Sequence, residues 1–244
     1  QIGLAIHNYH DSFRAMPPGW IGVTGTTTDI YGTNGWGWAA HILPQMEQSN
    51  LYSILDFKIN LNDASMNVAR ATVIPAFRCP SDVSPDTRLL NDASSDRELA
   101  TANYVGVFGT SDIDDCAASP NSRCQGEGVF YQDSHVQFRD ITDGLSNTLS
   151  VGERVTRENV AEPWHATWAG VIPNGDDAIV RILGTCDHTP NAPANHIDDF
   201  SSPHTGGAHF TFGDGSVKFV STNVDLGVYQ ALATRAGGET KHEF

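Results

Sequence analysis

Hydrophobic residues recur at helical spacing from the first residue of the chain. The apolar positions lie three or four residues apart and form one stripe: Ile2, Ile6, Tyr9 and Phe13. Pro17-Pro18-Gly19 ends the pattern, because proline removes a backbone donor and blocks helix continuation. We therefore predict a helix from Gln1 to about Phe13 that packs through this stripe.

The start of this helix lacks the usual N-cap signal. No Ser, Thr, Asp or Asn precedes the first residue of the apolar pattern. We expect the stretch to be the C-terminal end of a longer helix that begins upstream of Gln1.

Short helices are predicted in the next stretch of the chain. Apolar residues between Trp36 and Leu55 favour two short helices broken near Pro44 and Ser49. Asp63 can cap a further helix over residues 64–74, which Pro75 ends. Residues 83–100 are polar and are expected to form a loop.

Beyond residue 103 the pattern becomes that of β-strands. The expected strands cover residues 104–108, 128–131, 136–138, 148–151 and 164–172. Residues 173–207 are expected to be mostly loop. The clearest signal is a hairpin, in which the alternating runs 208–212 and 216–220 flank the turn Gly213-Asp214-Gly215. A last short helix is predicted over residues 228–234, ended by Gly237-Gly238.

This order of elements predicts an α+β fold in which the N-terminal helix packs on an antiparallel sheet. We expect one domain over residues 1–244. It would comprise a helical segment over residues 1–16, a helical and loop region over 17–100 and a β-rich region over 101–244 with loop insertions.

The charge of the chain excludes some classes of partner. The formal net charge is −15 and only three lysines occur, Lys58, Lys218 and Lys241. Such a surface repels phosphate backbones and anionic lipid headgroups, so we expect no nucleic-acid partner. No apolar run reaches the length of a membrane span.

The four cysteines indicate an oxidising compartment. None lies in a C-x-x-C motif, which argues against a zinc ribbon or a thioredoxin-like site. Cys116 and Cys124 flank a short polar loop, which favours a disulfide between them. A second bridge between Cys79 and Cys186 follows by elimination. Four buried free thiols are the alternative.

The sequence contains no recognised nucleophile, zinc-protease or P-loop motif, so we predict that the chain is not an enzyme. The acidic run Asp112, Asp114 and Asp115 offers oxygen ligands for calcium, although such runs are also ordinary solvated loops. No other cofactor is indicated.

Two further groups of residues carry alternative interpretations. Histidines and aspartates are concentrated in one loop-rich stretch. They suit either the ligands of a transition metal or groups that cap turns: Asp187, His188, His196, Asp198, Asp199, His204, His209 and Asp214. The tryptophans suit either a sugar-binding surface or a core: Trp20, Trp36, Trp38, Trp164 and Trp168.

Several stretches together resemble a known family. In chain order they are Gln1–His10, Pro17-Pro18-Gly19, Trp36-Gly37-Trp38, Leu43–Gln48, Cys79-Pro80-Ser81-Asp82, Asn103–Gly106, Asp140–Thr148, Val151–Arg154, His204 with Asp214-Gly215 nine residues later, and Ala231–Glu239. This pattern resembles a large family of bacterial envelope proteins of unknown function, abundant in planctomycetes and sometimes classed as solute-binding-like. Its members begin with a prepilin-type signal and end with an H-x9-DG motif.

The resemblance implies a pilin-like or pseudopilin-like head, outside the cytoplasm and tethered to the membrane before assembly. It implies self-assembly through the N-terminal helix, with other pilin-like subunits or secretion machinery as partners. An envelope module that binds a solute or glycan, and a secreted hydrolase, are the alternatives. We interpret His204, Asp214 and Gly215 of the H-x9-DG motif as structural, with His204 bonded to a nearby loop or to the turn itself.

Overall fold

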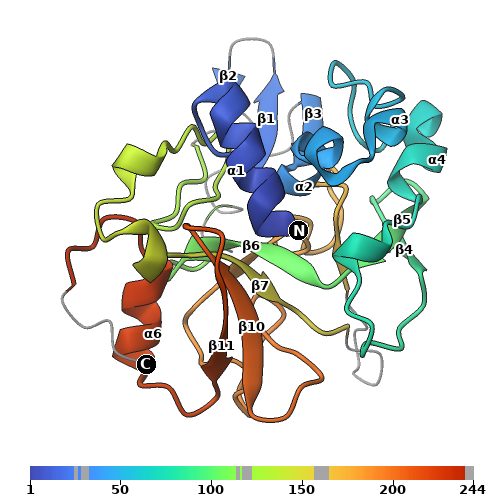
Figure 1. Cartoon of the computed structure of the whole chain (residues 1–244). Coiled ribbons are helices and arrows are strands. Elements are labelled where there is room, and N and C mark those ends of the chain that lie inside the picture. The colour runs from blue at the N-terminus through green and yellow to red at the C-terminus, as the bar shows by residue number, and fades with distance from the viewer. Residues whose placement is uncertain (25–26, 29–32, 114–115, 117–122, 157–164, 240–244) are drawn as a thin grey trace.

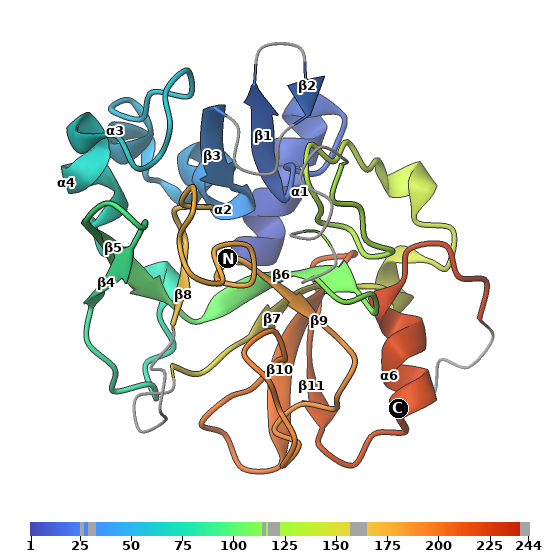
Figure 2. The ribbon, with the colours of Figure 1, turned by 180° about the vertical axis from the view of Figure 1, so that it is seen from behind.

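A computed structural model describes the chain except for residues 25–26, 29–32, 114–115, 117–122, 157–164 and 240–244. It has an α+β fold, as predicted, with an N-terminal helix, several short helices and three sheets (Figures 1 and 2). No helix in the described ranges is long and apolar enough to cross a membrane.

Helix α1 (Ile2–Phe13) forms where the apolar stripe predicts it. Arg14 ends it in the left-handed conformation, with φ 59°, and donates its N–H to the carbonyl of His10 at 2.7 Å. Ile2 and Ile6 are buried, and Tyr9 is partly buried. The predicted packing role of Phe13 is wrong: its side chain is 57% exposed, because the last turn of α1 extends beyond the surface on which the helix packs.

The central sheet has five strands in the order β11-β10-β7-β6-β9. Its members are β6 (Tyr104–Gly109), β7 (Leu149–Glu153), β9 (Leu183–Thr185), β10 (Gly207–Phe212) and β11 (Val217–Ser221). The predicted hairpin is confirmed as β10 and β11. The sheet is mixed rather than purely antiparallel, because β9 pairs with β6 in parallel. Strand β9 lies in the stretch that was expected to be loop.

Alternation along the strands of this sheet separates two cores. Val105, Val107 and Phe210 point to one face, which helix α6 (Leu226–Ala233) covers through Tyr229 and Leu232. The opposite face carries Tyr104, Val151 and Thr211, and α1 lies over part of it. The central sheet is therefore packed between the two terminal helices of the described chain (Figure 1).

Two smaller sheets flank the first. One contains β1 (Trp20–Thr24), β2 (Thr27–Thr28) and β3 (Thr33–Gly37), and the other contains β4 (Thr87–Asn91), β5 (Asp96–Ala102) and β8 (Ala166–Thr167). The expected loop over residues 83–100 is thus wrong. Its polar sequence belongs to the surface hairpin β4–β5, whose turn is held by the Asp92 carboxylate through the N–H groups of Ser94 and Ser95 at 3.0 and 2.8 Å.

Short helices form most of residues 38–77: α2 (Trp38–His41), η1 (Leu43–Met46), α3 (Ser49–Tyr52), η2 (Ala64–Met66), α4 (Asn67–Arg70) and η3 (Pro75–Phe77). Asp63 caps η2 as predicted, with its carboxylate accepting from the N–H of Ser65 at 2.9 Å. The helix expected to reach residue 74 ends at Arg70.

The expected strands over 128–131 and 136–138 do not form. Val129, Phe130 and Val136 are buried as strand residues would be, but their backbone is irregular and leads into η4 (Phe138–Asp140) and η5 (Leu145–Asn147). Of the strand expected over 164–172, the described residues form only β8. In both places the apolar residues of the sequence are buried, but the backbone does not form the continuous strand that their pattern predicts.

Candidate functional site

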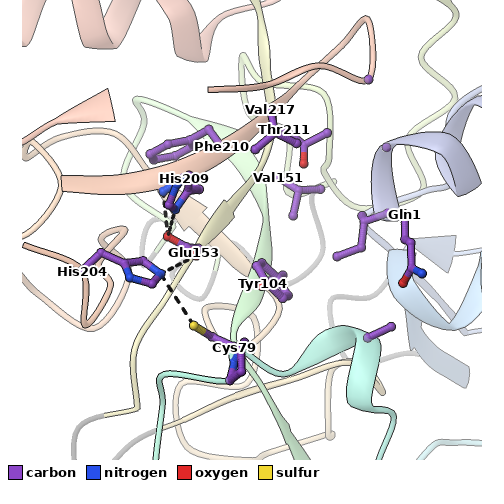
Figure 3. A pocket seen from close by; sticks show the side chains of 15 residues that line it. Gln1, Cys79, Tyr104, Val151, Glu153, His204, His209, Phe210, Thr211 and Val217 are labelled. Carbon is purple, nitrogen blue, oxygen red and sulfur yellow. Dashed lines mark hydrogen bonds and ion pairs between the residues drawn. The ribbon is translucent and has the colours of Figure 1, made fainter. Parts of the chain in front are cut away.

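A pocket of about 430 Å³ opens where α1 and the loop after η3 meet the face of the central sheet opposite α6 (Figure 3). Its lining comes from stretches of the chain far apart in sequence: Gln1, Ile2, Gly3, Ala76, Cys79, Pro80, Tyr104, Val151, Glu153, His204, His209, Phe210, Thr211, Gly215 and Val217. Side chains with acid, base and thiol chemistry gather on one side of it.

Strand β7 places a carboxylate in this pocket. Glu153 is the last residue of β7, pairs with Tyr104 of β6 and has a side chain only 6% exposed. One carboxylate oxygen accepts the backbone N–H of His209 at 2.7 Å and lies 3.2 Å from His209 Nδ1. The other oxygen lies 3.3 Å from His204 Nε2. Two histidines thus surround a nearly buried carboxylate.

A network of hydrogen bonds fixes Cys79 beside this carboxylate. The N–H of Cys79 donates to the side-chain oxygen of Asn103 at 2.9 Å, and the Asn103 amide donates to the Arg154 carbonyl at 3.1 Å and to the Asp82 carboxylate. The Asp82 carboxylate also accepts the N–H of Thr156 at 3.0 Å. Hydrogen bonds therefore join three segments of the chain next to the thiol: Cys79–Asp82, Asn103–Gly106 and Val151–Arg154.

His204 reaches the same point from the loop before β10. Its Nε2 atom lies 3.8 Å from Cys79 Sγ. Its backbone N–H donates to Ser202 Oγ at 3.1 Å, and its carbonyl accepts from the Asn191 side chain at 3.3 Å. These contacts link His204 to the pocket residues and to its own loop.

Asp214 and Gly215 lie in the β10–β11 turn and contact a different element. The Asp214 carboxylate accepts the N–H of Ser216 at 2.9 Å, and Gly215 has φ +82°. Helix α1 packs closely on this turn, with His7 Nε2 3.0 Å from the Gly213 carbonyl. A Cβ atom on Gly3 would lie only 3.0 Å from the Gly215 carbonyl oxygen. His204 and Gly215 therefore line the same pocket from two separate segments.

A family model described as "protein of unknown function (DUF1559)" matches residues 1–227. The chain belongs to this family. The resemblance inferred from the motifs is thereby confirmed at family level, and the family description names no activity. Neither a curated protein nor a solved structure matches the chain.

Tyr104 adds a neutral phenol to the pocket of this DUF1559 protein. Burial, together with the neighbouring Cys79 and Glu153, raises the pKa of Tyr104 to about 12. The phenol therefore stays protonated at neutral pH, so that it can donate a hydrogen bond to a ligand.

The contacts of His204 differ from those of a catalytic relay. In a nucleophile–base–acid relay the imidazole uses one nitrogen for the nucleophile and the other for the orienting carboxylate. Here the same atom, Nε2, faces both Cys79 Sγ and Glu153 Oε1. The three side chains converge on a shared point instead of forming a chain.

The histidine-rich stretch of this DUF1559 chain divides into two groups. His204 and His209 join the pocket, whereas His188 and His196 lie against Asp187, Asp198 and Asp199. His188 Nδ1 lies 3.2 Å from a carboxylate oxygen of both Asp187 and Asp199. Burial and the adjacent Asp187 raise the pKa of Asp199.

One of the two predicted disulfides is present. Cys116 and Cys124 are bonded, as their spacing suggests. The predicted bond between Cys79 and Cys186 is wrong, and both are unpaired. Cys186 lies in the core that α6 covers, beside Tyr229, whereas Cys79 lines the pocket. Burial raises the pKa of the Cys186 thiol.

The other candidate residues do not join the pocket lining. Asp114 and Asp115 of the predicted calcium site, and Trp164, lie outside the described residues, while Asp112 is exposed. The calcium site stays a prediction. Trp20, Trp36, Trp38 and Trp168 are at most 1% exposed, so they are core residues and form no sugar-binding surface.

Sequence reasoning missed Glu153 and Tyr104 as site residues. Both occur in stretches that were used only for the family resemblance. A glutamate shortly after the expected strand over residues 148–151 was the available signal, because a carboxylate at the end of a buried strand needs a partner.

Proposed function

We propose that this chain is the head of a pilin-like or pseudopilin-like envelope subunit that assembles outside the cytoplasm through its N-terminal helix. The observation that carries the proposal is the way α1 docks. Gly3, Ala5 and Ile6 are buried against the body, while Leu4 and Asn8 on the opposite side of the helix are exposed.

This arrangement suits a helix that belongs to the head on one side and to neighbouring subunits on the other. Leu4 is 66% exposed at the N-terminal end of α1, so most of this apolar side chain is left uncovered by the head. The Cys116–Cys124 disulfide favours an oxidising compartment, and the net charge of −15 favours a solvated outer surface. The proposal requires an apolar helix continuous with α1 on its N-terminal side.

The test uses the full-length gene product, expressed with a prepilin peptidase and imaged after shearing from the cell surface. The proposal predicts filaments, or membrane-tethered complexes, that Leu4→Glu abolishes, because a carboxylate would be buried between packed helices. Val68→Glu is the matched control, since Val68 is 76% exposed on α4. Both heads should melt within about 4 °C of the unchanged head. Assembly of Leu4→Glu at the level of the control would contradict the proposal.

The pocket favours a second candidate, an envelope module that binds a small solute. Its volume of about 430 Å³ lies in the range of small-molecule sites, and a phenol, a thiol and two imidazoles face it. Retention of a co-purified solute by the isolated chain, and its loss in Tyr104→Ala, would support this candidate. The two functions are compatible, because the pocket and the exposed side of α1 are different surfaces.

A further inference from the structure

We propose that Cys79, Glu153 and His204 bind one divalent transition-metal ion of the zinc type, with a fourth coordination position open to the pocket. The proposal concerns a site of this chain that is independent of its assembly. Figure 3 shows the three side chains directed toward one another from the loop after η3, from β7 and from the loop before β10.

The donor set is the first support. It offers one sulfur, one oxygen and one nitrogen, all within 4.8 Å of one another. Thiolate and imidazole ligands favour zinc and similar ions over calcium or magnesium, which prefer oxygen alone. Catalytic-type zinc sites commonly have three protein ligands and one exchangeable position.

The distances fit a tetrahedral ion. With Zn–N and Zn–O bonds of about 2.0–2.1 Å and a Zn–S bond of about 2.3 Å, tetrahedral angles separate N from O by about 3.3 Å and S from N by about 3.6 Å. His204 Nε2 lies 3.3 Å from Glu153 Oε1 and 3.8 Å from Cys79 Sγ. These two distances therefore match those expected for ligands of one tetrahedral ion to within about 0.2 Å.

The side chains that would bind the ion are held in place by outer contacts. The second oxygen of Glu153 is held by the N–H and Nδ1 of His209, which leaves Oε1 directed toward His204. The backbone of Cys79 is fixed by Asn103, and its carbonyl accepts the N–H of Asp82 at 3.0 Å. Such supporting hydrogen bonds orient metal ligands and raise affinity.

Charge balance points the same way. Within the described ranges of the chain, the ion-pair partners found for the Glu153 carboxylate are two histidines, His204 and His209. A divalent cation between Glu153 and Cys79 would place two positive charges beside this nearly buried carboxylate.

The open position would face a pocket whose walls include Tyr104, Val151 and Thr211. A water molecule, or a small ligand with an oxygen or nitrogen donor, has room there. Cys79 and Glu153 are buried, His204 is 31% exposed, and all three line the pocket, so an ion bound by them would be accessible from it.

Titration with Zn²⁺ and Co²⁺ under anaerobic conditions, without added thiol, tests the site. Calorimetry should give one Zn²⁺ per chain. Co²⁺ should give the near-ultraviolet charge-transfer band of a thiolate ligand and the visible bands of a tetrahedral ion. Cys79→Ser and His204→Ala should each weaken Zn²⁺ binding by about 100-fold or more, and Cys79→Ser should abolish the charge-transfer band.

The matched controls remove the same residue types elsewhere. Cys186→Ala removes the other unpaired thiol, and His135→Ala removes an exposed histidine, so both should leave Zn²⁺ binding unchanged. Because His204 is partly exposed, His204→Ala should fold even if Cys79→Ser does not. No uptake by the unchanged chain would overturn the proposal. So would Zn²⁺ binding that His204→Ala leaves intact, or a cobalt spectrum without a thiolate band.

Discussion

Buried cationic side chains of this protein bond mainly to backbone carbonyls. Arg154 is 1% exposed and donates to the carbonyls of Val180, Asp198 and Asp199, the last at 3.0 Å. Arg181 is also buried, and it donates to the carbonyls of Asp176 and His165 at 2.9 and 3.1 Å. The guanidinium groups thereby donate to carbonyls of the loops that surround them. They give the long segment after β8 a fixed position behind the central sheet.

His165, next to Arg181, gives a prediction about pH. Burial lowers the pKa of His165 to about 3, and the positive charge of Arg181 acts in the same direction. In the unfolded chain the pKa is about 6.5, so the unfolded state binds the additional proton between these two values. The stability contributed by the neutral imidazole is therefore complete above pH 6.5, and it decreases as the pH falls toward 3.

The expected slope from this residue is about 1.4 kcal/mol per pH unit at most. His165→Asn should flatten the dependence of the free energy of unfolding between pH 6.5 and pH 4, measured by urea denaturation. His135→Asn, at an exposed histidine, should leave the dependence as it is. An equal pH dependence in all three proteins would show that His165 is already protonated or solvated in the folded state.

At the scale of elements, the contact between α1 and the β10–β11 turn determines the position of the helix. A Cβ on Gly3 would lie 2.9 Å from Thr211 Cγ2 and 3.0 Å from the Gly215 carbonyl oxygen. Helix and hairpin can approach this closely only because Gly3 has no side chain. The same approach brings Gln1 and Ile2 to the edge of the pocket.

Gly3→Ala should therefore destabilise the protein by about 1–3 kcal/mol, although alanine is the better helix former. Gly227→Ala is the matched control, because Gly227 is exposed in α6 and a Cβ there would meet only the Asp225 carboxylate, at 3.2 Å. That control should not lower the free energy of unfolding. Adding Thr211→Ser, which removes the methyl group, should restore part of the loss in Gly3→Ala. Equal unfolding free energies for the two glycine variants would refute the close approach.

The elements with a local signal were predictable, and those defined by distant partners were not. The α1 stripe, the Asp63 cap and the Gly213-Asp214-Gly215 hairpin each depend on residues near one another, and all three are present. Strand β9 exists because it pairs with β6, about 75 residues earlier in the chain, and three residues leave no periodic signal. The β4–β5 hairpin was hidden because its outer residues are polar.

The candidate site was partly predictable for the same reason. His204 was noted as part of a motif, but its contact with Cys79 joins positions 125 residues apart. Glu153 became visible as a site residue only when β7 placed it between two histidines. The disulfide between Cys79 and Cys186 was predicted only because these were the two cysteines left over. In the structure Cys79 lines the pocket and Cys186 lies in the core that α6 covers, so the two thiols are unpaired.

At the scale of the whole molecule, the two faces of the mixed central sheet have different surroundings. The face that α6 covers is an apolar core, and the opposite face supports both the pocket and the docked α1. The two ends of the H-x9-DG motif, His204 and Gly215, both belong to the second face. This arrangement connects the position of the N-terminal helix to the shape of the pocket, so a ligand in the pocket would contact the first turn of α1.

The distribution of exposed apolar residues predicts the association state of the chain with the sequence printed here. The large exposed apolar side chains belong to several different elements and loops, including α1, α4, β4 and β11: Leu4, Phe13, Ile54, Val68, Val83, Leu89, Val217, Phe219 and Leu226. In the described parts of the chain these residues thus come from separate elements, whereas a stable interface buries a large continuous apolar patch. The net charge of −15 adds repulsion between copies.

We therefore expect this 244-residue chain to be a monomer at micromolar concentration. Sedimentation velocity at low salt should give a single species of about 26.3 kDa. Raising the salt screens the repulsion, since the Debye length falls from about 10 Å at 0.1 M to about 3 Å at 1 M. If the chain is a monomer only because of its charge, it will associate in 1 M salt. If the exposed side of α1 is by itself too small to hold two copies together, as we predict, the chain will remain a monomer there. A stable dimer at either salt concentration would contradict this expectation.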